Sequence, residues 1–193
     1  MEQPRKLVLA SASPYRRALL ERLGLRFEAA APQCDETALA GEAPADTALR
    51  LAVMKARALP FADALIIGSD QVASCAGERL GKPGDHANAL RQLRKLSGKA
   101  ADFHTAVSVL DTRNNQAESC VIVCRVFFRA LDDARIESYL RREQPYDCAA
   151  SAKAEGLGIA LIEKIETDDP TSLIGLPLIA LSAMLERAGL PVL

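Results

Sequence analysis

The sequence contains no tryptophan, and aromatic residues make up only 4% of its 193 residues. This scarcity argues against a surface that binds single-stranded nucleic acid by stacking several bases on aromatic side chains. An excess of charge of one sign is also lacking, since 24 Lys and Arg oppose 25 Asp and Glu, for a formal net charge of −1. This balance predicts no general attraction to nucleic acid or to an anionic membrane.

Long hydrophobic runs are missing as well. The longest apolar stretch, 173–185, is interrupted by Gly and Pro and is shorter than the roughly 20 residues that cross a bilayer. The apolar run 7–10 follows Arg5 and Lys6, but it is too short for the core of a secretion signal, so we interpret it as a first strand. We therefore expect no membrane association.

The five cysteines form an odd set without a CxxC pair or a neighbouring histidine cluster. This spacing favours reduced thiols and a cytoplasmic location over a disulfide framework, and it gives little support to a zinc site. The length, with 49% hydrophobic and 25% charged residues, is typical of one globular domain, which we expect to span 1–193.

Strand-like and helix-like patterns alternate along the chain. A strand over 6–10 leads into a helix in which Ser13 is the N-cap and Pro14 the first residue. A continuous apolar strand is expected at 64–68, as in a parallel sheet, and an antiparallel pair at 103–111 and 119–129. The other expected elements are helices over 46–59, from a cap at Asp85 to Gly98, over 131–141 and over 177–188, a hairpin or loop over 77–84, and a strand over 158–165. The pattern predicts the α/β class.

The most informative stretch is 11–17, SASPYRR. The helix dipole disfavours arginine in the first turn, yet Arg16 and Arg17 stand there side by side, where backbone N–H groups are also unpaired. Hydroxyls, free amides and guanidiniums at a strand-to-helix turn suit a di- or triphosphate. The alternative is a solvated pair that forms salt bridges with Glu21 or Glu28, and the local sequence leaves both interpretations open.

Three acidic residues, at two places in the chain, are candidates for chemistry. Asp70 follows the strand 64–68, and the ligand crevice of a parallel sheet lies beyond the carboxyl ends of its strands. Asp70 is therefore a candidate base, although an aspartate that caps a turn would fit equally well. Asp35 and Glu36 add the oxygen ligands that a hard divalent cation prefers.

Two lysines are also candidates. Lys55 shares a helical face with Leu51 and Leu59, so its ammonium either enters a cleft or extends to the surface. Lys82 lies in a loop between Gly and Pro and is either a phosphate contact or an ordinary loop lysine.

Seven fragments of the chain occur in the order and spacing seen in the Maf family of nucleoside triphosphate pyrophosphatases, and they cover nearly the whole sequence. They are 9–17 (LASASPYRR), 35–37 (DET), Lys55, 67–71 (IGSDQ), 81–83 (GKP), 155–159 (EGLGI) and 175–178 (GLPL). The resemblance implies a Maf/ITPase-like α/β fold, an elongated mixed sheet with flanking helices and two lobes around a central cleft. It also implies hydrolysis of a nucleoside triphosphate to the monophosphate and pyrophosphate.

The resemblance also implies roles for individual residues. Asp70 would be the proton acceptor, and Glu36 with Asp70 would hold a divalent cation, Mg²⁺ or Mn²⁺. The residues implied around the phosphates are Ser11, Arg16, Arg17, Lys55 and Lys82. The expected partner is a nucleoside triphosphate substrate, with no nucleic acid and no membrane, and a homodimer is left open.

Three positions bear on which base is bound. One branch of the family resembles dTTP and UTP pyrophosphatases and tends to have Arg, a Thr-like residue and Gln where this chain has Tyr15, Gln71 and Glu155. The other branch resembles enzymes that act on 7-methyl-GTP, whose cationic base suits an aromatic face and whose N–H donors suit a carboxylate. We therefore expect removal of 7-methyl-GTP from the nucleotide pool. The alternatives are a dTTP/UTP pyrophosphatase and a non-catalytic nucleotide-binding regulator of cell division.

Overall fold

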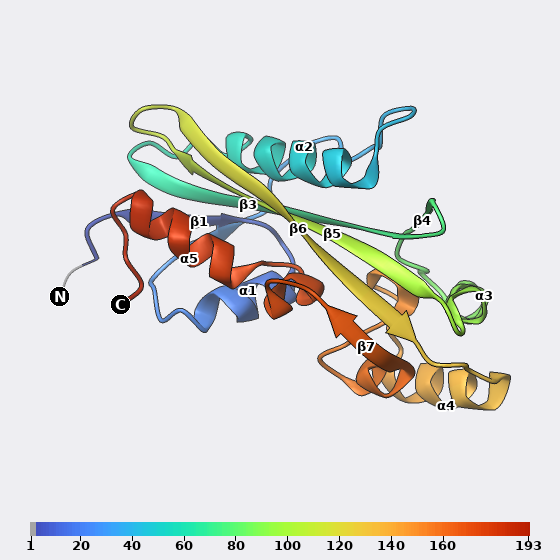
Figure 1. Ribbon diagram of the computed structural model, residues 1–193. Helices are drawn as coiled ribbons and strands as arrows, with labels where there is room; N and C mark the ends of the chain where they lie inside the picture. Colours follow the sequence, from blue (N-terminus) through green and yellow to red (C-terminus); the bar gives the residue numbers. More distant parts are fainter. Residues whose placement is uncertain (1–2) are drawn as a thin grey trace. The chain divides into compact units, whose positions relative to one another are not determined.

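The computed structural model describes residues 3–193 (Figure 1). These residues divide into two compact units. Unit 1 runs to residue 71 and includes 105–122 and 169–193, whereas unit 2 consists of 72–104 and 123–168. The expected single domain over 1–193 stays a prediction, and its residues 1 and 2 lie outside the described part.

The strands form one mixed sheet of seven strands in the order β2-β1-β3-β5-β6-β7, with β4 paired to β3. Their bounds are β1 Lys6–Ala10, β2 Glu28–Ala30, β3 Ala64–Cys75, β4 Glu78–Leu80, β5 Ala100–Asp111, β6 Gln116–Phe128 and β7 Ile162–Glu166. β1 is parallel to β2 and β3, whereas β4 is antiparallel to β3 and β7 to β6. The α/β class with a mixed sheet is thus confirmed.

Five α-helices and three short 3-10 helices lie among the described residues. They are α1 Pro14–Glu21, α2 Pro44–Arg57, α3 His86–Leu96, α4 Asp133–Glu143 and α5 Leu178–Arg187, with η1 Ala149–Ser151, η2 Leu157–Leu161 and η3 Pro170–Ile174. Ser13 caps α1 and Asp85 caps α3, as expected, because each side chain accepts a hydrogen bond from a backbone N–H of the first turn. No helix within 3–193 is long and apolar enough to cross a membrane. All five cysteines are free thiols.

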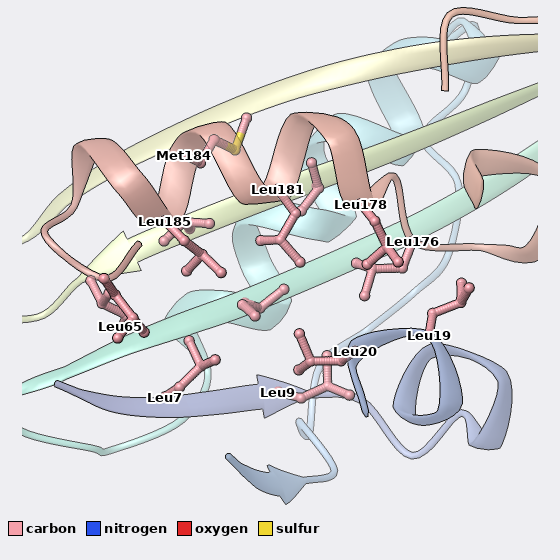
Figure 2. Packing of buried hydrophobic residues seen from close by; sticks show 14 residues of the cluster. Leu7, Leu9, Leu19, Leu20, Leu65, Leu176, Leu178, Leu181, Met184 and Leu185 are labelled. Atoms are coloured by element: carbon pink, nitrogen blue, oxygen red, sulfur yellow. The ribbon is translucent and has the colours of Figure 1, made fainter. Parts of the chain in front are cut away.

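In unit 1, helices cover both faces of the sheet. Strand residues alternate between faces, so Leu7 and Leu9 pack with α1 and α5, toward Leu181 and Leu185 (Figure 2). The opposite face carries Val8 and its neighbours, which pack against α2. Each fully buried leucine contributes about 1.5–3 kcal/mol through the apolar surface it removes from water. Unit 1 is therefore a three-layer arrangement around β1, β3 and β5.

The structure corrects three expectations. The strand expected at 64–68 continues to Cys75, because its second half pairs with β4. The strand expected at 158–165 begins only at Ile162, since the backbone N–H of Gly158 turns back to the carbonyl of Lys153 and 157–161 forms η2. The apolar spacing of Leu49, Val53 and Ala56 predicts the buried face of the second helix; Ala56 is buried, but positions 49 and 53 are partly exposed, and the buried face also includes positions 52 and 55.

Gly68 sets the distance between β3 and α2. A Cβ at this position would overlap the carbonyl oxygen of Ala52 and lie 2.7 Å from the backbone nitrogen of Ala56. Both atoms belong to the backbone of α2, so they cannot move aside without displacing the helix. The absence of a side chain at Gly68 therefore allows α2 to lie directly on the strand.

We expect Gly68→Ala to lower the free energy of unfolding by about 1–3 kcal/mol, because the added methyl group forces α2 away from a well-packed strand. Gly81→Ala is the matched control, since a Cβ there meets no atom within 4 Å. Thermal or urea unfolding of both variants measures the effect. Equal stability of the two variants would contradict the close approach of α2.

Candidate functional site

A buried lysine contacts two carboxylates in unit 1. The Nζ atom of Lys55 lies 2.7 Å from Oε2 of Glu36 and 2.7 Å from Oδ1 of Asp70. Only 4% of Lys55 is exposed, and a buried ammonium costs several kcal/mol unless opposite charges and hydrogen bonds compensate it. Lys55 therefore points inward, and the alternative of an exposed ammonium is wrong. Its contact with phosphate stays a prediction.

The position of Asp70 follows from the unequal lengths of the strands. β1 ends at Ala10, whose partner in β3 is Gly68, so Asp70 lies two residues beyond the last pair. Asp70 is thus beyond the carboxyl end of β1, although its own strand continues past it. Residues 66, 68 and 70 share one face of β3, and α2 packs on that face, which brings Lys55 to Asp70. Glu36 reaches the same ammonium from the loop before α2, where its side chain remains 55% exposed.

Arg16 belongs to the same electrostatic environment. Burial lowers the pKa of Arg16, while the negative charges of Asp70 and Glu36 raise it. Its Nε donates a hydrogen bond of 2.9 Å to the carbonyl oxygen of Gly175, which fixes the guanidinium at the start of α1. Arg16 is therefore held by the backbone next to the carboxylate pair.

The other members of the stretch 11–17 have different surroundings. Ser11 is buried, and its Oγ accepts a hydrogen bond of 3.1 Å from the backbone of Ser13. Arg17 is exposed, and its guanidinium lies over the ring of Phe27, 5.9 Å from the centroid. The alternative salt bridges to Glu21 or Glu28 are not formed within residues 3–193, and Glu28 pairs instead with Lys6 at 2.9 Å. Phosphate binding by Ser11, Arg16 and Arg17 stays a prediction.

Two residues expected to read the base lie in unit 1. Tyr15 is half-buried in the first turn of α1. Gln71 follows Asp70 in β3 and so faces the opposite side of the sheet. Its Nε2 donates to Oγ1 of Thr105 at 2.9 Å and to the carbonyls of Ser172 and Leu173 at 2.9 and 3.1 Å. The amide nitrogen of Gln71 thus holds η3 against the sheet, and contact of either residue with a base stays a prediction.

Sequence patterns missed the part played by Gly175 and Ser69. The carbonyl oxygen of Gly175 accepts hydrogen bonds from Arg16 and from the hydroxyl of Ser69, the latter at 3.0 Å. Gly175 has a φ of +122°, which side chains rarely tolerate. The motif GLPL contains this glycine, but only the folded chain shows that its carbonyl links η3 to α1 and β3.

Lys82 and Glu155 both belong to unit 2. Lys82 is exposed two residues after the end of β4, and Glu155 is exposed in the segment between η1 and η2. Their contacts with phosphate and with base stay predictions.

Helix α4 holds the segment that carries Glu155. Oε2 of Glu143 accepts a hydrogen bond of 2.7 Å from the backbone of Leu157, and Oε1 lies 2.9 Å from Nζ of Lys153. These contacts hold the pKa of Glu143 below its usual range. A Cβ at Gly156 would lie 2.6 Å from the same carboxylate, so a side chain there would displace the Glu143 carboxylate from these contacts. Glu155 therefore lies between Lys153 and Leu157, which both contact Glu143 of α4.

The donor chemistry of Glu36 and Asp70 fits a hard divalent cation. No group of three or more His, Cys, Asp or Glu that could hold a metal occurs within residues 3–193, so a cage made by the protein alone is not formed there. Mg²⁺ usually takes one or two carboxylates together with substrate phosphates and water. The two carboxylates that converge on the Lys55 ammonium match that share of the ligands in number and type, and metal binding by them stays a prediction.

Comparison with known proteins agrees with the resemblance found in the sequence. The 7-methyl-GTP pyrophosphatase of Cupriavidus pinatubonensis is 55% identical over 188 residues, covering 96% of this chain and 94% of the relative. The 7-methyl-GTP pyrophosphatase of Thiobacillus denitrificans is 56% identical over 189 residues, covering 97% of this chain and 94% of the relative.

A solved structure of a HAM1 protein from Coxiella burnetii shares 17% identity with a TM-score of 0.43, covering 64% of this chain and 73% of that chain. This likeness is too distant to support an argument about the site. The family model described as "Maf-like protein", in contrast, matches residues 6–188. The chain therefore belongs to the family of Maf-like proteins.

Proposed function

We propose that this protein hydrolyses 7-methyl-GTP to 7-methyl-GMP and pyrophosphate. The observation that carries the proposal is the buried contact of Lys55 with Glu36 and Asp70. It occurs in a chain that shares more than half of its residues with relatives named 7-methyl-GTP pyrophosphatase. A module that only binds nucleotides needs no carboxylate at this position, so the paired acids favour an enzyme over a regulator.

Three residues of unit 1 have separate roles in the proposed reaction. Arg16 binds phosphate oxygens through its terminal nitrogens, since its Nε is already bonded to the protein. Lys55 orients the Asp70 carboxylate through Oδ1. Asp70 takes the proton of a water that attacks the α-phosphorus. The bond from the α-phosphorus to the bridging oxygen breaks, and pyrophosphate leaves with that oxygen.

A divalent cation, Mg²⁺ or Mn²⁺, is part of the proposal, with Glu36 and Asp70 as its protein ligands. When bound, the ion would offset the phosphate charge and polarise the phosphoryl group. Without it, a triphosphate would meet two carboxylates of its own sign.

Base recognition is assigned to Tyr15, Gln71 and Glu155, with Lys82 as a further phosphate contact. The carboxylate of Glu155 matches the N1–H and N2–H₂ donors of guanine, and Tyr15 offers an aromatic face to the cationic ring. We place the protein in the cytoplasm, where its five free cysteines stay reduced. Its binding partner is the nucleoside triphosphate substrate. We propose no binding to nucleic acid or to a membrane.

Asp70→Asn should reduce kcat by about 10²–10⁴-fold, the usual contribution of a general base, because the amide cannot accept the proton. Turnover is measured by phosphate release with an inorganic pyrophosphatase as the coupling enzyme. Asp111→Asn is the control, since it weakens the ion pair of Arg5 with Asp111, 2.7 Å apart, elsewhere in unit 1. Normal turnover by a folded Asp70→Asn protein would remove Asp70 from the mechanism.

Removal of divalent cations should abolish turnover, because the substrate phosphates and the carboxylates of Glu36 and Asp70 then repel one another. The assay is run after EDTA treatment and again after Mg²⁺ or Mn²⁺ is added back in excess. We expect recovery with either ion and none with Na⁺ at equal ionic strength. Full activity in metal-free buffer would be incompatible with the proposed cation.

Glu155→Gln should lower kcat/KM for 7-methyl-GTP by about one to two powers of ten, because an NH₂ group would face a guanine donor and leave hydrogen bonds unmet. The measurement is the ratio of kcat/KM for 7-methyl-GTP to that for UTP. Glu163→Gln, an equal loss of charge on exposed β7, should leave the ratio unchanged. A wild-type ratio that favours UTP, or no change with Glu155→Gln, would favour a pyrimidine enzyme.

A further inference from the structure

Unit 2 contains three arginine side chains without a partner. Other arginines of unit 2 have a side-chain partner: Arg94 pairs with Asp133 at 2.8 Å, Arg125 pairs with Asp102 at 2.7 Å, and Arg91 donates to the side chain of Asn88. The side chains of Arg129, Arg135 and Arg142, in contrast, make no hydrogen bond or ion pair within residues 3–193, and these three line one cavity.

The cavity lies between α4, η2 and the end of β6 and has a volume of about 630 Å³. Arg135, Ser138 and Arg142 project from one face of α4, because they are spaced by three and four residues. Leu157 and Leu161 of η2 form an apolar wall. The volume falls within the range of small-molecule sites, roughly 300–1,000 Å³.

The charge of the cavity is of one sign. No acidic residue lines it, so three guanidiniums face the same space without neutralisation. Arg135 and Arg142 are two helical turns apart, about 10 Å along the axis of α4. A ligand that contacts both must therefore be extended, and guanidiniums favour phosphate oxygens because they donate two parallel hydrogen bonds.

We propose that this cavity is a binding site for a small phosphorylated molecule, separate from the residues assigned to the substrate. Its phosphate groups contact Arg129, Arg135 and Arg142, and Ser138 adds a hydroxyl donor. Neither Lys82 nor Glu155, the two residues of unit 2 assigned to the nucleotide, lines the cavity. Two sources share this chemistry, an inorganic pyrophosphate and a nucleoside monophosphate whose base rests on the leucines of η2.

The cavity is connected through the backbone to the segment that carries Glu155. Leu157 contributes to the cavity wall, and its backbone N–H is bonded to Glu143, directly after the segment that carries Glu155. A ligand that packs against Leu157 therefore stabilises the same turn that holds Glu155 in place.

The test is an NMR titration of the full-length protein with sodium pyrophosphate and, separately, with GMP, at constant ionic strength. Backbone amide signals of Ala160 and Leu161 report on this cavity, whereas the amide of Leu157, next to the segment of Glu155, also responds to a base bound there and is not used. We expect saturable shifts at the amides of Ala160 and Leu161. Arg135→Gln and Arg142→Gln should each raise the Kd at least about tenfold, because each removes a charge-assisted contact.

Arg141→Gln is the matched control, because Arg141 is adjacent on α4, carries the same charge, and pairs with Glu137 at 3.3 Å outside the cavity. It should leave the Kd unchanged. A lower Kd for GMP identifies a nucleotide as the ligand type, and a lower Kd for pyrophosphate identifies an inorganic one.

Three results would overturn the site. The amides of Ala160 and Leu161 could fail to shift at millimolar ligand, or shift equally in all three variants. A tenfold loss of turnover in Arg135→Gln or Arg142→Gln would instead make the cavity part of the substrate site. None of these readouts depends on which nucleotide is hydrolysed, so the site and the proposed function fail independently.

Discussion

The burial of the Lys55 ammonium is the constraint on which the candidate site depends. A charge that is 4% exposed requires opposite charges within hydrogen-bond distance, and within residues 3–193 Glu36 and Asp70 supply them. Loss of the buried Asp70 carboxylate would leave an imperfectly compensated charge in the interior, at a cost of about 3–5 kcal/mol, whereas the pair with the half-exposed Glu36 contributes less. The same contact therefore stabilises unit 1 and fixes the carboxylates that the proposed chemistry uses.

Close approach between backbones makes that contact geometrically feasible. Gly68 lets α2 lie directly on β3, which places Lys55 over Asp70 two residues further along the strand. Gly175 acts in a similar way on α1, because its carbonyl oxygen holds Arg16 beside the carboxylates. Each glycine thus fixes the position of a charged side chain on a helix elsewhere in the sequence: Gly68 that of Lys55 on α2, and Gly175 that of Arg16 on α1.

Helix α4 has two distinct roles in unit 2. Tyr139 and Glu143, one turn apart, hold the segment after η1 through the backbone nitrogens of Lys153 and Leu157. Arg135 and Arg142 line the cavity beside η2. α4 therefore contacts the segment that carries Glu155 and also lines the cavity to which we assign the phosphorylated ligand.

Much of the fold was readable from local pattern, because caps and apolar periodicity act over a few residues. The Ser13 cap, the Asp85 cap and the strand 6–10 were predicted within a residue of their observed positions. The family resemblance was carried by short motifs in sequence order, and it was confirmed by the family match over 6–188.

The charge pairing of Lys55 could not be predicted from local sequence. Glu36 and Asp70 are 19 and 15 residues away along the chain, and the local pattern left burial and exposure of the ammonium equally open. Packing of α2 on Gly68 decided between them, because only tertiary contact determines which face of a helix loses water.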